Sequence, residues 1–414
     1  MKKHTILGMV LLASTSVMAG SISVPVAYDN AKVLPKGVRN LRYNNVMAEA
    51  NTKYDEFGNS VGVGDAFNVD VSYNKLIDGK DTALEKGILQ GYLQRHGKDL
   101  NAVAGETTGV VNVEVDAQVP VFAMGLTRKW TAAIVVPIVE SKTNVDTGFL
   151  AGSEIQSIAN QLISEGKGFK AEEVQQKTNN AIIDSVAKKG YKPLADEQKD
   201  MLGDIRIVNK LQLKNEKDYA ISLTNSLVLP TGEEADIDKV VDVGAGDGQF
   251  DVEAGINVDF NMTSRVTVSA RASYTWQIAD TTAKRVPEKA DSTVTPDVDY
   301  QVKRDLGDII YTSIGAGYLM DSGIQLRGQY SFQYKEGDVY TGDKYESYRY
   351  DWMGQKTSQR LHAAQLGIGY STIPAFKRKE FAVPLELNLS LGTPISGKNV
   401  TNDTTIAAEV AVFF

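Results

Sequence analysis

The sequence contains no cysteine and only three histidines. Without thiols there can be no disulfide, no thiolate metal site, no cysteine nucleophile and no lipid-modified cysteine of a lipoprotein. The formal net charge of -8, with no basic stripe to balance it, argues against a nucleic-acid partner. The D-x-D-x-D-G spacing of a dedicated calcium loop is also missing. We therefore expect neither a metal nor a cofactor.

The amino terminus has the organisation of a secretory signal peptide. Lys2 and Lys3 precede an apolar core, Ile6–Ala13, and small residues then lead to Ala19, where cleavage is expected. Beyond this leader, no apolar run approaches the ~18 residues that a spanning helix needs. If the exported chain crosses a membrane, it must do so as a closed β-barrel, which satisfies its own backbone hydrogen bonds in lipid.

Apolar and polar residues alternate with a period of two in a series of segments, which is the pattern of β-strands. Each segment is about 10 to 13 residues long, as a tilted membrane-spanning strand requires. The segments include GVVNVEVDAQVPVF, KWTAAIVVPIVE, DIRIVNKLQLKN, YAISLTNSLVL, FDVEAGINVDF, RVTVSARASYTWQ, DIIYTSIGAGYLM, IQLRGQYSFQYK, RLHAAQLGIGYS, FAVPLELNLSL and TTIAAEVAVFF.

The connections between these segments alternate between short and long, which is the layout of outer-membrane barrels. The short ones are Met124–Arg128, Asn215–Asp218, Asn261–Ser264, Met320–Gly323 and Ile373–Glu380. The long ones are Lys142–Gly203, Pro230–Gln249, Ala279–Asp305, Glu336–Ser358 and Thr393–Asn402. We predict an all-β fold, a transmembrane antiparallel up-and-down β-barrel of about 12 strands, with the short turns on the periplasmic side.

The first strand is ambiguous, because both residues 36–48 and residues 65–77 alternate. We expect a signal peptide at 1–19, a periplasmic segment, plug or first strand at 20–64, and the barrel at 65–414. Helical insertions are expected in the extracellular loops at about 79–104 and 148–203, with helices over residues 83–96, 154–166 and 171–190. A lid on the barrel mouth is favoured over a docking surface for them.

The stretch VVDVGAGDGQF (Val240–Phe250) resembles the first glycine-rich motif of cofactor-dependent methyltransferases. That motif needs a helix directly after its glycines. Here the alternating segment FDVEAGINVDF follows, which predicts a strand. We therefore expect an external loop, with the glycines serving tight turns.

The carboxyl terminus resembles the assembly signal of bacterial outer-membrane proteins. Thr404, Ile406, Ala408, Val410, Val412 and Phe414 share one face of the last predicted strand. The terminal Phe414 is the expected contact with the barrel assembly machinery. Outer-membrane lipid and lipopolysaccharide are the other expected partners, and the expected location is the outer membrane of a Gram-negative cell.

Strand alternation also predicts the charged side chains that line the lumen. The acidic candidates are Glu114, Asp116, Asp251, Glu253, Asp259, Glu386 and Glu409, and the basic ones are Arg206, Lys210, Arg265, Arg271, Arg327 and Lys335. Because an interior charge must find a partner or water, two arrangements fit. One is a charged pore that selects solutes, and the other is a closed network of ion pairs.

Catalysis is not expected. Outer-membrane phospholipase is also a 12-stranded barrel, but it requires a serine beside a histidine. Only His96 and His362 remain after leader removal, and no G-x-S-x-G motif supports a serine nucleophile.

Several pieces together resemble one family. These are MLGDIRIVNKLQL, LVLPTG, VGAGDGQFDVEAG and the hairpin VPVFAMGLTRKWTAAIVVPIV. They are similar to outer-membrane proteins of the phenol meta-cleavage-pathway family, which groups with the long-chain fatty-acid transporter type of barrel. The Asn-Pro-Ala-Gly plug motif of true fatty-acid transporters is absent, which argues against lateral delivery of lipids.

The resemblance implies passive uptake of small, often hydrophobic or aromatic solutes, and it supplies no catalytic residues. The alternative is a closed structural barrel whose helical extracellular loops bind a partner.

Overall fold

The computed structural model of the protein describes residues 21–25, 27–78, 83–153, 186–290, 292 and 294–414, together with 155, 157, 160 and 164. The predicted signal peptide lies outside these residues. Within the described part of the chain, no helix is long and apolar enough to cross a membrane.

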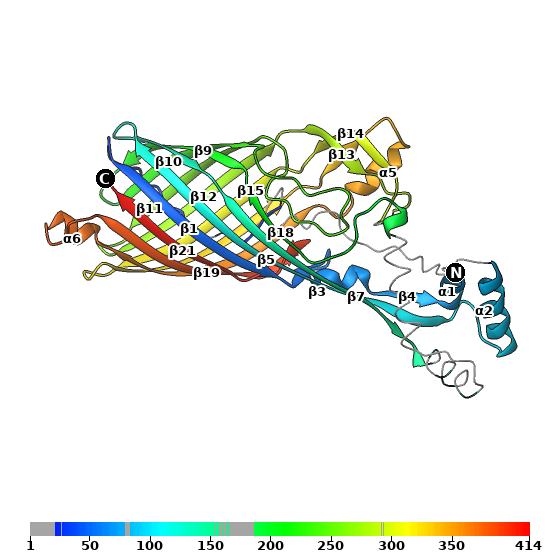
Figure 1. Ribbon diagram of the computed structural model, residues 1–414. Helices are drawn as coiled ribbons and strands as arrows, with labels where there is room; N and C mark the ends of the chain where they lie inside the picture. Colours follow the sequence, from blue (N-terminus) through cyan, green and yellow to red (C-terminus); the bar gives the residue numbers. More distant parts are fainter. Residues whose placement is uncertain are drawn as a thin grey trace.

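A closed antiparallel barrel of 12 strands forms the centre of the described structure (Figure 1). Each strand pairs with its neighbour in sequence, and β1 closes the wall by pairing with both β21 and β5. The fold prediction is therefore confirmed. The wall strands are β1 (Arg39–Ala50), β5 (Val103–Gly125), β6 (Trp130–Val135) with its continuation β7 (Ile138–Ala151), β9 (Ile205–Asn215), β10 (Tyr219–Leu229), β11 (Asp251–Asn261), β12 (Val266–Gln277), β15 (Ile309–Leu319), β16 (Ile324–Lys335), β18 (Gln359–Ser371), β19 (Leu385–Lys398) and β21 (Thr405–Phe413).

The first strand is β1, which falls in the earlier of the two candidate segments. The later candidate instead forms a short strand, β4 (Val69–Ser72), and a helix, α1 (Tyr73–Asp78), outside the barrel. The expected barrel boundary at residue 65 is therefore wrong, and the barrel begins at residue 39. The clean alternation of residues 65–77 was misleading, because within this segment only Val69–Ser72 pairs with a neighbouring strand.

The alternation of each strand separates an apolar outer wall from a polar inner one. In β10, Leu223 and Leu227 are exposed on the outer face, whereas Ser222, Thr224 and Ser226 are buried inside. Lipid accepts the leucines, and the inward hydroxyls find polar partners in the lumen. The sequence pattern thus fixes which face of each strand meets the membrane.

Short turns join the strands at the end of the barrel that carries the carboxyl terminus. They span residues 126–129, 216–218, 262–265 and 320–323, and the longer turn at 372–384 contains α6 (Ile373–Lys377). The long connections lie at the other end. Two of them contribute β13 (Asp280–Arg285), β14 (Val298–Asp305), β17 (Val339–Thr341) and α5 (Ser347–Met353) to a layer over the mouth. A small separate sheet is formed by β2 (Thr52–Tyr54), β3 (Ser60–Gly62) and β20 (Val400–Thr401).

One side of the wall extends far beyond the rest, as a ribbon of β5, β7 and β8 (Glu197–Leu202) (Figure 1). β6 gives way to β7 at Val136 and Pro137, and β8 gives way to β9 at Gly203 and Asp204. Pro137 has no N–H to donate to the ladder, so the pairing is interrupted there. The Gly203 N–H donates to the Pro137 carbonyl (2.9 Å), which joins the two interrupted strands.

The ribbon carries the turn η1 (Val63–Phe67), β4, α1 and α2 (Ala83–Arg95), with a small core of its own around Tyr73, Leu93 and Phe149. The helix expected at 83–96 corresponds to α2. The helices expected at 154–166 and 171–190 fall largely outside the described residues, although Gly190 has a φ of 82°, the conformation expected of a helix-terminating glycine.

The glycine-rich stretch forms an external loop that folds over the inner face of this ribbon. Val243 and Ala245 pack into the apolar core formed by Val113, Val139 and their neighbours. Gly248 has a φ of 80°, and a Cβ on Gly246 would lie 2.6 Å from the Gly232 Cα. The glycines therefore allow a tight turn and a close backbone approach, and a strand follows them rather than a helix.

Candidate functional site

The lumen contains a segment of the protein itself. Residues 21–25 and 27–34, which we call the strap, run inside the barrel from the long-loop end to the short-turn end. At the first end, the Gln359 Oε1 accepts hydrogen bonds from the Ser21 hydroxyl and the Ile22 N–H, both at 3.0 Å. At the other end, the Leu34 N–H donates to the Thr131 hydroxyl (2.8 Å), beside the turn at 126–129. The chain then turns into β1.

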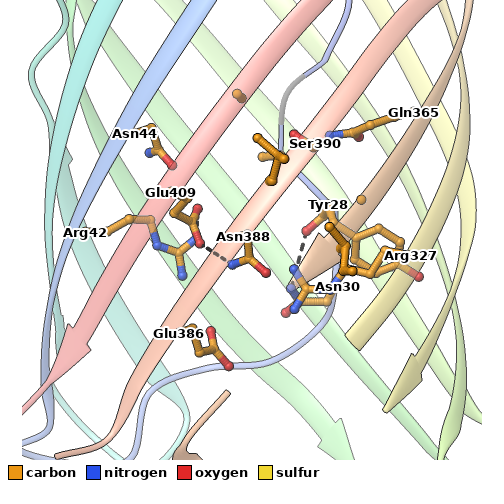
Figure 2. Close-up of a pocket in the computed structure, with 15 residues that line it drawn as sticks. Tyr28, Asn30, Arg42, Asn44, Arg327, Gln365, Glu386, Asn388, Ser390 and Glu409 are labelled. Carbon is orange, nitrogen blue, oxygen red and sulfur yellow. Dashed lines mark hydrogen bonds and ion pairs between the residues drawn. The ribbon is translucent and has the colours of Figure 1, made fainter. Parts of the chain in front are cut away.

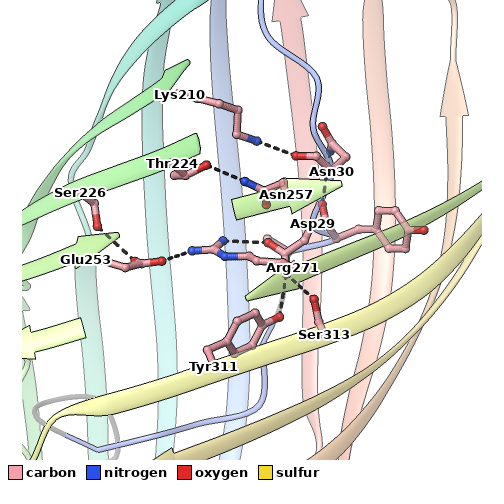
Figure 3. Close-up of polar contacts among 12 residues, drawn as sticks. Asp29, Asn30, Lys210, Thr224, Ser226, Glu253, Asn257, Arg271, Tyr311 and Ser313 are labelled. Carbon is pink, nitrogen blue, oxygen red and sulfur yellow. Dashed lines mark hydrogen bonds and ion pairs between the residues drawn. The ribbon is translucent and has the colours of Figure 1, made fainter. Parts of the chain in front are cut away.

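An ion-pair network holds the middle of the strap (Figure 3). Asp29 accepts hydrogen bonds from Arg271 (2.8 Å), the Tyr311 hydroxyl (2.7 Å) and the Ser313 hydroxyl (3.0 Å). Arg271 also pairs with Glu253 of the adjacent strand. Three charges that would be costly to bury singly are thus partnered, and one of them belongs to the strap.

The strap backbone is bound mainly by side chains of the wall. The Lys210 ammonium donates to the Asn30 carbonyl (2.9 Å), and the Gln333 amide donates to the Ser23 carbonyl (2.6 Å). Among the described residues, no part of the strap pairs with a wall strand as a β-ladder. The strap therefore occupies the lumen without belonging to the sheet.

Two glycines of the wall leave room for strap side chains. A Cβ on Gly315 would lie 2.9 Å from the Tyr28 ring, and one on Gly392 would collide with the Val24 side chain. Val24 and Ile22 in turn form a buried cluster with Leu361 of β18. The strap is consequently seated by shape and apolar contact as well as by charge.

A cavity of about 90 Å³ remains beside the strap (Figure 2). Arg42 and Glu409 form an ion pair on one side of it (3.1 Å), and the Asn388 amide donates to Glu409 (2.7 Å). Arg327 lies over the Tyr28 ring on the other side, 5.6 Å from its centre. This volume is smaller than the ~150 Å³ of a dry cavity that accepts benzene.

Strand pairing and burial place most of the predicted lumen residues on the inner wall. These are Arg206, Lys210, Asp251, Glu253, Asp259, Arg271, Arg327, Lys335, Glu386 and Glu409. Arg206, Glu253 and Arg271 form one connected group, since Arg206 approaches Glu253 at 3.4 Å. Lys335 instead pairs with Asp338, close to the mouth.

Three predicted lumen residues lie elsewhere. Glu114 and Asp116 are on the outer face of β5, where Glu114 pairs with Lys142 at 3.8 Å and Asp116 bonds to Asn45. Val113 and Val115 of the same strand face inward, where they pack with Val243 and Ala245 of the glycine-rich loop, so this part of the interior has an apolar filling. Arg265 lies in a turn at the rim and pairs with the exposed Asp321. The alternating pattern identified β5 correctly as a strand, but the assumption that charged residues face the lumen assigned Glu114 and Asp116 to the wrong face.

Asp29, the strap residue at the centre of the ion-pair network, is not among the predicted site residues. Residues 20–64 were considered as a plug, but the short segment has no period to place it. The available signal was the polar sequence Tyr28-Asp29-Asn30 between the leader and the first strand.

Neither remaining histidine forms a pair with a serine among the described residues. The His362 Nδ1 is 2.6 Å from the Tyr330 hydroxyl, and its ring lies against Phe332 on the wall. The His96 ring stacks on Tyr92 in the loop region. Each histidine therefore has an aromatic neighbour in place of a nucleophile.

Searches with the sequence found no matching family model and no matching curated protein. Solved structures with the same barrel fold exist. The COG4313 outer membrane channel from Pseudomonas putida F1 is similar with a TM-score of 0.54 and 10% identity, over 94% of this chain and 100% of that one. This similarity confirms the β-barrel fold that the sequence resemblance implies.

More distant similarity extends to a toluene transporter, TodX of Pseudomonas putida (TM-score 0.33, 11% identity, 92% of this chain and 90% of that one). A FadL homologue of Pseudomonas aeruginosa has a TM-score of 0.33 at 9% identity, again over 92% of this chain and 90% of that one.

Proposed function

We propose that the protein is an outer-membrane channel for passive uptake of small, hydrophobic or aromatic solutes, and that the strap closes it at rest. The observation that supports this function is the composition of the lumen. A purely structural barrel can fill its interior with side chains of the wall. Here the strap fills part of the interior and is held mainly by side-chain contacts. It can therefore leave while the hydrogen bonds between the wall strands stay intact.

The solute class follows from the sequence resemblance, which implies small apolar compounds. The fold shared with the Pseudomonas putida channel supports the channel function itself. Outer-membrane lipid, lipopolysaccharide and the barrel assembly machinery are the partners that this location implies. No catalytic step is proposed.

The test is solute flux with and without the strap. The wild-type protein and a variant lacking residues 21–34 are reconstituted into liposomes, and entry of benzyl alcohol and of a small polar solute, arabinose, is measured. We expect the deletion to raise the flux of both solutes above that of the wild type. Heat-modifiable migration on gels checks that the shortened barrel is folded.

The second candidate is a closed barrel whose extracellular part binds a partner. The long β5–β7 ribbon favours it, because α1 and α2 form a separate core at a distance from the lumen. A folded, strap-deleted barrel that conducts neither solute would favour this docking function over the channel.

A further inference from the structure

The connection between β18 and β19, residues 372–384, differs from the other short-end turns. Those span only 126–129, 216–218, 262–265 and 320–323, whereas this one contains a helix, α6. Figure 1 shows α6 projecting beyond the barrel end that carries the carboxyl terminus. No residue of α6 is buried. We call residues 372–384 the long turn.

The base of the long turn is fixed to the barrel. The Thr372 hydroxyl donates to the Val383 carbonyl (2.6 Å) and accepts a hydrogen bond from the Leu385 N–H (2.9 Å). The tip is closed by the Glu380 N–H, which donates to the Ala375 carbonyl (2.9 Å). The turn is therefore a defined projection with a set direction.

Apolar side chains continue from the wall into the long turn. Phe381 and Val383 have the same strand parity as Leu387 and Leu389, which are exposed on the outer face of β19. Phe381 is 44% exposed, Val383 42%, and Phe376 of α6 42%. The lipid-facing surface thus extends further toward this end along β19 than along strands that end in tight turns.

Three cations lie between Phe376 and Phe381 at the tip: Lys377, Arg378 and Lys379. Glu380 pairs with Arg378 (2.8 Å), and within the described structure no carboxylate lies within ion-pair distance of Lys377 or Lys379. Lys379 has a φ of 64°, which turns the backbone sharply after α6. Two unpaired ammonium groups therefore stand next to exposed aromatic rings.

We propose that the long turn binds anionic phospholipid headgroups of the periplasmic leaflet. Phe376 and Phe381 enter the boundary between headgroups and acyl chains, and Lys377 and Lys379 contact the phosphates. Exposed rings beside unpaired cations form the combination that an anionic membrane surface attracts. The inference rests on the proposed placement of the barrel in the outer membrane.

The test measures lipid contact directly. Two single-tryptophan variants are made. One carries W130F, W276F, W352F and F376W, and the other carries only W130F and W352F, so that it retains Trp276, which is exposed on the outer wall. Both are placed in nanodiscs containing brominated phosphatidylcholine or brominated phosphatidylglycerol. We expect both lipids to quench Trp276 and the anionic lipid to quench residue 376 more strongly, with a preference of roughly fivefold for each unpaired lysine.

The substitutions K377Q and K379Q together should bring that preference close to one. K214Q and K217Q are the matched control, since they remove two cations at the same end of the barrel, near a turn that contains Glu216 and Asp218. The control should leave the preference unchanged. If Trp276 is quenched but residue 376 is not, or the lysine variants keep the preference, the inference is overturned. If Trp276 itself is not quenched, the membrane placement fails.

Discussion

The substitution Asp29→Asn tests how the strap is held. It removes a charge-assisted hydrogen bond to Arg271, whose usual contribution is about 1.5–3 kcal/mol. Arg271 keeps its pairing with Glu253, so the larger penalty of an orphaned buried charge does not arise. A net loss of about 2 kcal/mol shifts the equilibrium between seated and released strap by roughly 30-fold. The packing of Ile22 and Val24 is unchanged, so the strap is loosened rather than removed.

The assay is single-channel recording of the open fraction in planar bilayers. Tyr311→Phe and Ser313→Ala form the comparison, because each removes one hydrogen bond from a neutral hydroxyl to the charged Asp29 and leaves the ion pair with Arg271 in place. We expect the open fraction to rise in all three variants and most in Asp29→Asn, because that substitution removes the charge that all three hydrogen bonds share. An unchanged open fraction in Asp29→Asn, with a normally folded barrel, would refute the ion-pair network as the restraint.

Three further predictions concern other parts of the molecule. Arg285 donates hydrogen bonds to the carbonyls of Lys189, Gly190, Ile237 and Thr295 and pairs with Asp238. Arg285→Ala should therefore increase protease cleavage of these extracellular loops about tenfold, while the melting temperature of the barrel stays unchanged. Phe414 and Arg39 exchange backbone hydrogen bonds of 2.8 and 3.0 Å; deleting Phe414 should leave the protein exported but poorly assembled, without resistance to SDS at room temperature. Burial, together with the nearby charge of Glu49, raises the pKa of Asp403 to about 7 from 3.8. The folded state therefore holds this proton more tightly than the unfolded state, so stability should fall as pH rises from 3.8 to about 7, and Asp403→Asn should remove that dependence in pH-resolved melting.

The barrel was predictable because its signals are local and repeated. In β12, alternation places Ser269 and Arg271 inside and Trp276 outside, and the short turns set the order of the strands. Register followed from the same pattern, because a shift by one residue would turn every apolar side chain inward.

Other features depend on contacts distant in sequence. Asp29 contacts Arg271 only after the strands have closed into a barrel, and no local sequence pattern indicates that contact. Glu114 and Asp116 seemed luminal because charge usually avoids the lipid-facing side. This rule does not hold for the part of β5 that extends beyond the membrane. There, water reaches the outer face, and the loop containing Val243 and Ala245 makes the inner face apolar.

A disulfide lock shows whether release of the strap opens the channel. The natural chain has no cysteine, so Asp29→Cys with Ser313→Cys, at two side chains in contact at 3.0 Å, introduces the sole thiol pair. Flux of benzyl alcohol through the same reconstituted sample is compared before and after reduction. We predict only the background flux of protein-free liposomes when the pair is oxidised and faster flux when it is reduced. Equal flux in both states would contradict this role of the strap.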